Sequence, residues 1–277
     1  MTLSGRNNLF KAGIVLASLC VLWMIIASIV VIPAYSLIDT ENVRRSEGLI
    51  QIFIGQFLKI NFYAVHMSLA EAILYALISL ILIYHFFEQT HAPEILFIAA
   101  FVVSLAFEAA RLILPLHWIY DIPSLYLLMA SRVLLFGRYF GTFSLFAASV
   151  CASGLDVQKT RNSILVILGA TLIISLGVPI DTQTWDSSLS MVNGYTSMFR
   201  LIEAGTFLTT LISFFIAAYS RGSREYALIG VGAFLSLLGR TLLLEGDTWI
   251  SPILGILLLS AGTWFICIKL HKVYLWL

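Results

Sequence analysis

The chain consists of long apolar runs separated by short polar segments. A transmembrane helix needs about 20 consecutive, mostly apolar residues to cross the hydrocarbon core of a bilayer. Eight such runs occur along the sequence, at residues 12–35, 61–87, 95–116, 124–152, 164–180, 195–219, 226–244 and 250–268. We therefore predict an all-α fold, a polytopic membrane helical bundle with eight transmembrane helices.

The first run follows Arg6 and Lys11, an arrangement that also opens secretory signal peptides. The apolar core of a signal peptide has about 7–15 residues. The run from Ala12 to Tyr35 is longer than that. We therefore expect it to be a retained membrane helix.

Composition supports the membrane assignment. Hydrophobic residues make up 60% of the chain and charged residues 11%, with a mean hydropathy of +0.97. Soluble domains carry about 25% charged residues, so a soluble enzyme, a secreted disulfide scaffold and a disordered regulator are excluded. The net charge of +1 provides no basic surface for nucleic acid. The three cysteines lie in separate apolar runs and form no disulfide or metal motif.

Charged residues between the runs indicate an orientation, because lysine and arginine are enriched in cytoplasmic loops. Basic residues gather at one set of run ends: Arg6, Lys11, Lys159, Arg161, Arg221, Arg224, Lys269 and Lys272. Acidic residues and tryptophans gather at the other: Asp39, Glu41, Glu47, Asp121, Asp181, Asp186, Glu245, Asp247, Trp118, Trp185 and Trp249. We predict an integral protein of a bacterial inner membrane with both termini in the cytoplasm.

The long first outer loop departs from this pattern, because it holds Arg44, Arg45 and Lys59. Its segment 48–59 is too short to span a bilayer. It is either an amphipathic helix in the outer interface or an extension of the second span.

An internal repeat relates the two halves of the chain. Asn61, Tyr63, Leu69, Glu71 and Ala72 recur as Asn193, Tyr195, Leu201, Glu203 and Ala204, each 132 residues later. Each half contains four runs, so both halves have the same orientation. We predict two parallel four-helix repeats, residues 1–155 and 156–277, related by a pseudo-twofold axis along the membrane normal. The alternative is chance similarity between leucine-rich helices.

Ionisable residues inside the predicted spans are the candidate site, because a charge within a bilayer is costly and marks function by default. The chain has eight: Glu71, Glu108, Arg111, Arg132, Arg138, Arg200, Glu203 and Arg240. At about 1.5 Å per residue, most lie in the outer half of the bilayer. Two pairs, Glu108 with Arg111 and Arg200 with Glu203, have the i,i+3 spacing of a helical ion pair.

The five arginines outnumber the three glutamates of this set. Guanidinium groups bind phosphate and carboxylate in bidentate fashion. Arg132 and Arg138 lie six residues apart, so they point to different sides of their helix, and neither has an acidic neighbour one turn away. The motif Gly137–x–x–x–Gly141 predicts a close helix contact around Arg138. We predict that all eight residues line an outward-facing polar pocket for an anionic ligand.

A structural role is the alternative for these charges, because polar pairs between membrane helices also fix packing. Sequence motifs of serine nucleophiles, zinc proteases and phosphate-binding loops are missing. This favours a protein that is not an enzyme, although an intramembrane lipid enzyme needs no linear motif. We expect no cofactor and no metal site, since the five histidines show no ligand spacing.

Two functions follow from these patterns. The first is binding or transport of an anionic small molecule or lipid headgroup. The second is a non-catalytic membrane subunit or sensor module that docks partner proteins. No predicted span shows the midplane break of many secondary transporters, which weighs against transport. Expected partners are membrane lipids, an anionic ligand or other membrane proteins, and not nucleic acid.

Overall fold

The computed structural model describes residues 3–34, 43–44, 61–90, 92–154 and 160–275. Almost all of these residues are helical. The elements in chain order are α1 (Leu3–Ala34), β1 (Val43–Arg44), α2 (Phe62–Phe87), α3 (Pro93–Ala106), the 3-10 helix η3 (Phe107–Leu112), α4 (Ile113–Tyr120), α5 (Ser124–Ser153), α6 (Thr160–Gly177), β2 (Ile180–Asp186), β3 (Met191–Asn193), α7 (Thr196–Ser220), α8 (Arg224–Glu245) and α9 (Ile250–Leu275).

Seven helical segments of the described chain are long and apolar enough to span a membrane. They correspond to every predicted span except the fifth, and α3, η3 and α4 together make the third. The fifth predicted span is α6, which is apolar but shorter. We predicted helix as far as residue 180, whereas α6 ends at Gly177. Pro179 explains the difference, because proline disfavours helical geometry at the residue before it.

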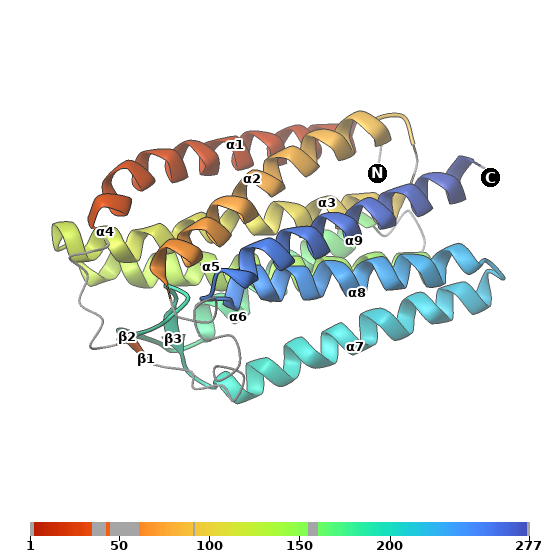
Figure 1. Cartoon of the computed structure of the whole chain (residues 1–277). Coiled ribbons are helices and arrows are strands. Elements are labelled where there is room, and N and C mark those ends of the chain that lie inside the picture. The colour runs from red at the N-terminus through yellow and green to blue at the C-terminus, as the bar shows by residue number, and fades with distance from the viewer. Residues whose placement is uncertain (1–2, 35–42, 45–60, 91, 155–159, 276–277) are drawn as a thin grey trace.

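The helices run along a common direction, with the strands at one end of the bundle (Figure 1). α1 begins and α9 ends at the opposite end, so both ends of the described chain lie on the same side of the bundle (Figure 1). This is the arrangement that an even number of crossings requires.

The small sheet is a departure from the predicted all-α fold. Its strand order is β1-β2-β3, with β2 and β3 antiparallel. Asp181 forms a turn in β2, where its carboxylate accepts hydrogen bonds from the Gln183 amide at 2.9 Å and the Thr184 hydroxyl at 2.7 Å. These donors stabilise the ionised form and hold the pKa of Asp181 below its ordinary value.

The core of the bundle surrounds α3. Phe97, Phe101, Val102 and Leu105 on this helix are fully buried. α3 contacts α1, α2 and α5, while α5 also packs against α7 and α2 packs against α9. The last two contacts join the first half of the chain to the second. α7 lies at the edge of the bundle (Figure 1).

The predicted glycine contact in α5 is confirmed. A Cβ atom added at Gly137 would lie 2.6 Å from the Cβ of Phe107. One added at Gly141 would lie 2.1 Å from the hydroxyl oxygen of Ser104. Both glycines therefore let α5 approach α3 and η3 closely, on the face next to Arg138.

A second glycine contact, between α8 and α9, was not predicted. A Cβ at Gly239 would lie 2.3 Å from the backbone nitrogen of Leu259, and one at Gly262 would lie 2.6 Å from the carbonyl oxygen of Gly232. Gly232 and Gly239 on α8 are seven residues apart, as are Gly255 and Gly262 on α9. A seven-residue spacing places both glycines on the same face of a helix, so each helix turns its glycine face toward the other.

The repeated motif has two local structures. Asn61 is the N-cap of α2, and its side chain accepts a hydrogen bond from the Tyr63 amide at 2.8 Å. Asn193 ends β3 instead, and Tyr195 precedes α7 with a left-handed φ of 57°. The helices therefore begin at different points of the motif, and the two-repeat arrangement remains a prediction. The predicted interfacial segment 48–59 lies outside the described residues.

Candidate functional site

The site begins in the middle of the third span, where the regular helix tightens into the 3-10 helix η3. Pro115 lies four residues after Arg111 and has no amide hydrogen, so it cannot complete the helical bond to the Arg111 carbonyl. The Trp23 indole donates instead to the neighbouring Ala109 carbonyl at 3.2 Å. The helix tightens here without unwinding, and Pro93–Tyr120 remains one continuous helical span.

Glu108 and Arg111 lie on this 3-10 segment. Side chains three residues apart eclipse each other in a 3-10 helix. The Nε atom of Arg111 lies 2.7 Å from Oε2 of Glu108, and the predicted pair is confirmed. The second oxygen, Oε1, lies 3.2 Å from Nε of Arg138 on α5. One buried carboxylate thus joins two arginines, and Glu108 is only 1% exposed.

Arg111 also fixes the end of the bundle where the strands lie. It donates one hydrogen bond to the Leu244 carbonyl at 2.7 Å and another to the Ser188 carbonyl at 3.2 Å. Leu244 lies in the last turn of α8, and Ser188 lies between β2 and β3. Arg111 is therefore held by three elements and is 3% exposed.

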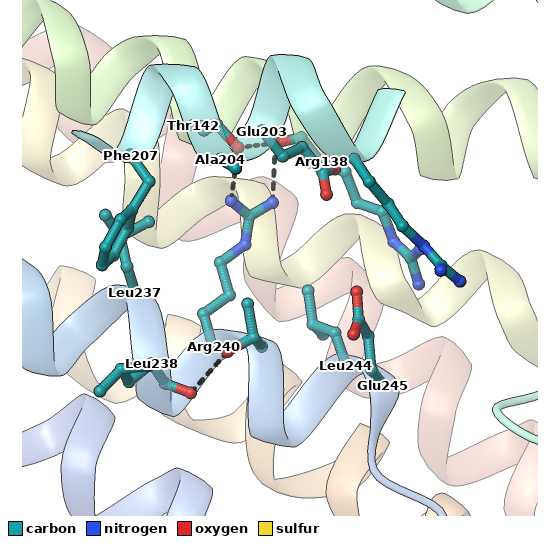
Figure 2. A pocket seen from close by; sticks show the side chains of 12 residues that line it. Arg138, Thr142, Glu203, Ala204, Phe207, Leu237, Leu238, Arg240, Leu244 and Glu245 are labelled. Atoms are coloured by element: carbon teal, nitrogen blue, oxygen red, sulfur yellow. Dashed lines mark hydrogen bonds between the residues drawn. The ribbon is translucent and has the colours of Figure 1, made fainter. Parts of the chain in front are cut away.

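Arg240 on α8 reaches across to α5. Its guanidinium donates to the Thr142 hydroxyl at 2.9 Å and to the Arg138 carbonyl at 2.7 Å, as Figure 2 shows. The same guanidinium lies 5.7 Å from the centre of the Phe101 ring. These contacts place a buried cation between α3, α5 and α8.

A cavity of about 300 Å³ adjoins Arg240 (Figure 2). Its walls come from α5, α7 and α8, and we call it the α5/α7/α8 pocket. The lining residues are Arg138, Thr142, Arg200, Glu203, Ala204, Phe207, Leu237, Leu238, Arg240, Thr241, Leu244 and Glu245.

The charges on these walls do not cancel. Arg138, Arg200 and Arg240 face two carboxylates, Glu203 and Glu245. Nη2 of Arg138 and Nε of Arg240 are buried without a hydrogen-bond partner in the described structure. A buried donor left unsatisfied costs about 1–3 kcal/mol, and more for a charged group. The walls therefore carry more positive than negative charge, and two buried guanidinium donors on them have no partner in the described structure.

Four of the eight predicted residues line this pocket: Arg138, Arg200, Glu203 and Arg240. Glu108 and Arg111 do not line the pocket, but Glu108 forms an ion pair with Arg138, which does. Arg132 points to the opposite side of α5, as its spacing from Arg138 predicts, and donates to the carbonyls of Ser175 and Leu176 at the end of α6. The structure therefore places Arg132 as a cap on α6, away from the pocket.

One predicted ion pair, between Arg200 and Glu203, is not formed. Among the described residues, no ion pair joins Arg200 to Glu203, although both line the pocket. Arg200 is exposed, so its side chain extends outward from α7. Glu71 is half-buried on α2, and its Oε2 atom has no hydrogen-bond partner in the part of the chain that the structure describes.

Sequence reasoning identified four of the twelve lining residues, and the polar residues that it missed include Glu245 and Thr142. Glu245 was assigned to the outer loop, yet it ends α8 and closes the pocket wall. Thr142 lies one turn after Arg138 and is uncharged, so nothing in its type marked it. Its spacing of four residues from Arg138 places both on one helix face, which is the signal that the sequence offers.

A second and larger cavity, of about 850 Å³, lies on the other side of α7. Its walls come from α5, α6 and α7 and carry no charged side chain. The residues on α7 are Ile202, Gly205, Thr206 and Thr209. The N-terminal half of α7 thus separates a charged cavity from an apolar one.

Comparison with known proteins identifies one distant relative and no family. The chain is 20% identical to an uncharacterised protein of Treponema pallidum (strain Nichols) over 239 residues, and the match covers 69% of each protein. No family model matches the sequence. No solved structure matches it either.

Proposed function

We propose that this protein binds an anionic group, a phosphate or a carboxylate, in the α5/α7/α8 pocket of a membrane bundle. The observation that carries the proposal is the charge of the walls, where three arginines face two glutamates and Nη2 of Arg138 has no partner. An anion would balance the excess charge and satisfy this donor. Guanidinium groups suit the task because their planar forks match the geometry of both anions.

The arrangement around Arg138 prepares it for this role. Glu108 holds its Nε atom and leaves Nη2 free. The Arg138 carbonyl in turn accepts from Arg240, which also donates to Thr142. Two of the three pocket arginines are therefore held in place before a ligand arrives, which lowers the entropy cost of binding.

The pocket faces outward in the orientation that we propose, an integral protein of a bacterial inner membrane with both termini in the cytoplasm. Arg221, Lys269 and Lys272 lie toward the end of the bundle where α9 ends, whereas Asp181, Asp186, Trp118, Trp185 and Trp249 lie toward the strands. Basic residues favour the cytoplasmic side. Transport is an extension of the proposal.

Thermal unfolding of the purified protein in detergent tests the proposal, with phosphatidylglycerol and inorganic phosphate as anionic probes and phosphatidylcholine as the neutral control. A ligand that binds only the folded state raises the melting temperature. Arg200→Ala should weaken binding of an anionic probe by about tenfold or more, since a hydrogen bond to a charged group contributes about 1.5–3 kcal/mol. Arg200 forms no ion pair in the described structure, so this variant should fold normally.

Arg132→Ala is the matched control, because it removes an arginine from the same membrane region but from outside the pocket. It should lower the melting temperature and leave the shift caused by the probe intact. Arg138→Ala is a second pocket variant. It should lower the melting temperature and also reduce the shift caused by the probe. Equal shifts in the wild type, Arg200→Ala and Arg138→Ala would overturn the proposal.

A non-catalytic subunit or sensor module is the second candidate. The specific observation in its favour is that Arg111, Arg132 and Arg240 all donate to backbone carbonyls of other helices or loops. These three arginines therefore contribute to packing whatever the pocket binds. The same experiment separates the two functions, because a purely structural set of charges predicts no shift with any anion.

A further inference from the structure

The α5/α7/α8 pocket opens sideways, toward the lipid. Ala204 on α7 and Thr241 on α8 line it and are exposed, and Leu238 is 36% exposed. Ala204 and Leu238 lie about two turns inside helices that are long and apolar enough to span the membrane, and Thr241 lies one turn before the end of α8. A surface that is exposed at this position along a span faces acyl chains. The rim between α7 and α8 is therefore an opening to the bilayer.

The outer half of α7 is packed loosely enough to let a ligand pass. The buried residues of α7 are Thr210, Phe214 and Ala217, all in its inner half. From Thr196 to Thr209 every residue is at least partly exposed. The apolar cavity on the other face of this segment leaves room for α7 to move, and a Cβ atom added at Gly205 would meet nothing within 4 Å.

The walls of the pocket have two chemical characters. The arginines and glutamates form a polar part, while Ala204, Phe207, Leu237, Leu238 and Leu244 form an apolar part. Phe207 and Leu237 lie deeper along their helices than Arg200 and Glu245 do. A small soluble anion would use only the polar part. A molecule with an anionic head and a hydrocarbon chain would use both.

We infer that the ligand is an amphiphilic anion, a lipid with a phosphate or carboxylate headgroup, which enters between α7 and α8 from the outer leaflet. The guanidiniums of Arg138, Arg200 and Arg240 hold the headgroup. The chain passes Ala204 and Leu238 into the bilayer. This inference rests on the proposed function, since it names the class of anion that the pocket takes.

Ala204→Trp tests the sideways route, because the indole would fill the rim without removing a charge. Leu201→Trp is the matched control, since Leu201 is on the same helix, is 73% exposed and does not line the pocket. The probes are phosphatidylglycerol in mixed micelles and soluble glycerol 3-phosphate, with binding measured from the shift in melting temperature. Leu238→Trp blocks the same rim from α8 and replaces Ala204→Trp if that variant does not fold.

The expected result is that the wild type and Leu201→Trp bind the lipid at least about tenfold more tightly than the soluble anion, whereas Ala204→Trp loses most of this difference. Equal affinity of the wild type for both probes, or unchanged lipid binding by both rim variants, would overturn the inference and leave the proposed function standing. Binding of neither probe to the wild type would overturn the proposed function itself.

Discussion

Glu108 shows how a single residue determines whether buried charges stabilise this protein. A buried ion pair gains little over apolar side chains of the same size, because desolvation offsets the attraction. Removal of one partner is different, since it leaves an uncompensated charge in a low-dielectric environment. Glu108 has two arginine partners, at 2.7 and 3.2 Å, so its loss affects both.

We predict that Glu108→Gln lowers the free energy of unfolding by about 3–5 kcal/mol, because it leaves Arg111 and Arg138 without their shared counter-charge. Glu225→Gln is the control. Glu225 pairs with Lys269 at 3.1 Å and Lys272 at 2.7 Å near the surface, where a pair contributes about 0.2–1 kcal/mol. Denaturant unfolding in detergent measures both values. A loss for Glu108→Gln no larger than that for Glu225→Gln would contradict the prediction.

At the residue scale, local spacing predicted part of the site. The pair Glu108–Arg111 and the divergence of Arg132 from Arg138 both follow from positions along one helix. The partners of Arg132 and Arg240 did not follow, because they are backbone carbonyls of other helices. Backbone acceptors are present at every residue, so the sequence does not mark them, and only the packing of the helices selects one.

At the element scale, apolar runs predicted the helices and missed the strands. The segment from Ile180 to Asp186 reads I-D-T-Q-T-W-D, too short and too polar to count as a run. Alternation of apolar and polar residues is the usual sign of a strand, and here it extends over only a few residues. The hairpin is held instead by specific contacts, such as the ring contact between Trp118 and Trp185 at 4.8 Å.

Glycine substitutions provide a prediction at this scale. Gly239→Ala should destabilise the protein by about 1–3 kcal/mol, because its Cβ would overlap the backbone of α9, which cannot move aside without shifting the helix. Gly205→Ala should be neutral or stabilising by up to about 1 kcal/mol, since its surroundings are open and alanine favours helix. The melting temperatures of the two variants test this prediction. Equal decreases in melting temperature would show that α8 and α9 are not in close contact.

The proposed repeats can be compared through the helix contacts of the two halves. A pseudo-twofold that exchanges α2 with α7 and α5 with α9 would convert the α5–α7 contact into the α9–α2 contact, and both contacts exist. The first helices of the halves differ, since α1 packs on α2 and α3 while α6 packs on α5. The duplication therefore remains a prediction, supported by some contacts and not by others.

At the scale of the whole molecule, membrane topology is open to direct measurement. We predict that a cysteine at Asp186 reacts with an impermeant thiol reagent from outside the cell. One at Ser223 should react only after the membrane is permeabilised. The background protein would carry substitutions of Cys20, Cys151 and Cys267. The reverse pattern would invert the bundle and place the pocket on the cytoplasmic side.

The sequence predicted the membrane bundle at this scale but not the position of the pocket. Hydropathy shows over what length each helix is apolar, and this length is enough to identify a membrane helical bundle. The pocket depends on the loose fit of α7 against α5 and α8, which arises from three helices together. Glu245 illustrates this, because its place in the pocket follows from where α8 ends beside α7.

The bridge made by Glu108 also bears on biosynthesis. An arginine near the centre of a helix costs about 2.5–3.5 kcal/mol when the helix leaves the translocon for lipid. α4 and α5 are separated only by Asp121, Ile122 and Pro123. Glu108 and Arg138 can therefore meet while their two helices are being inserted as one hairpin, before α8 has been synthesised. Chain order in this way supplies Glu108 with arginine partners from its own and the next helix, whereas Arg240 reaches its partners on α5 only when α8 joins a bundle that is already partly assembled.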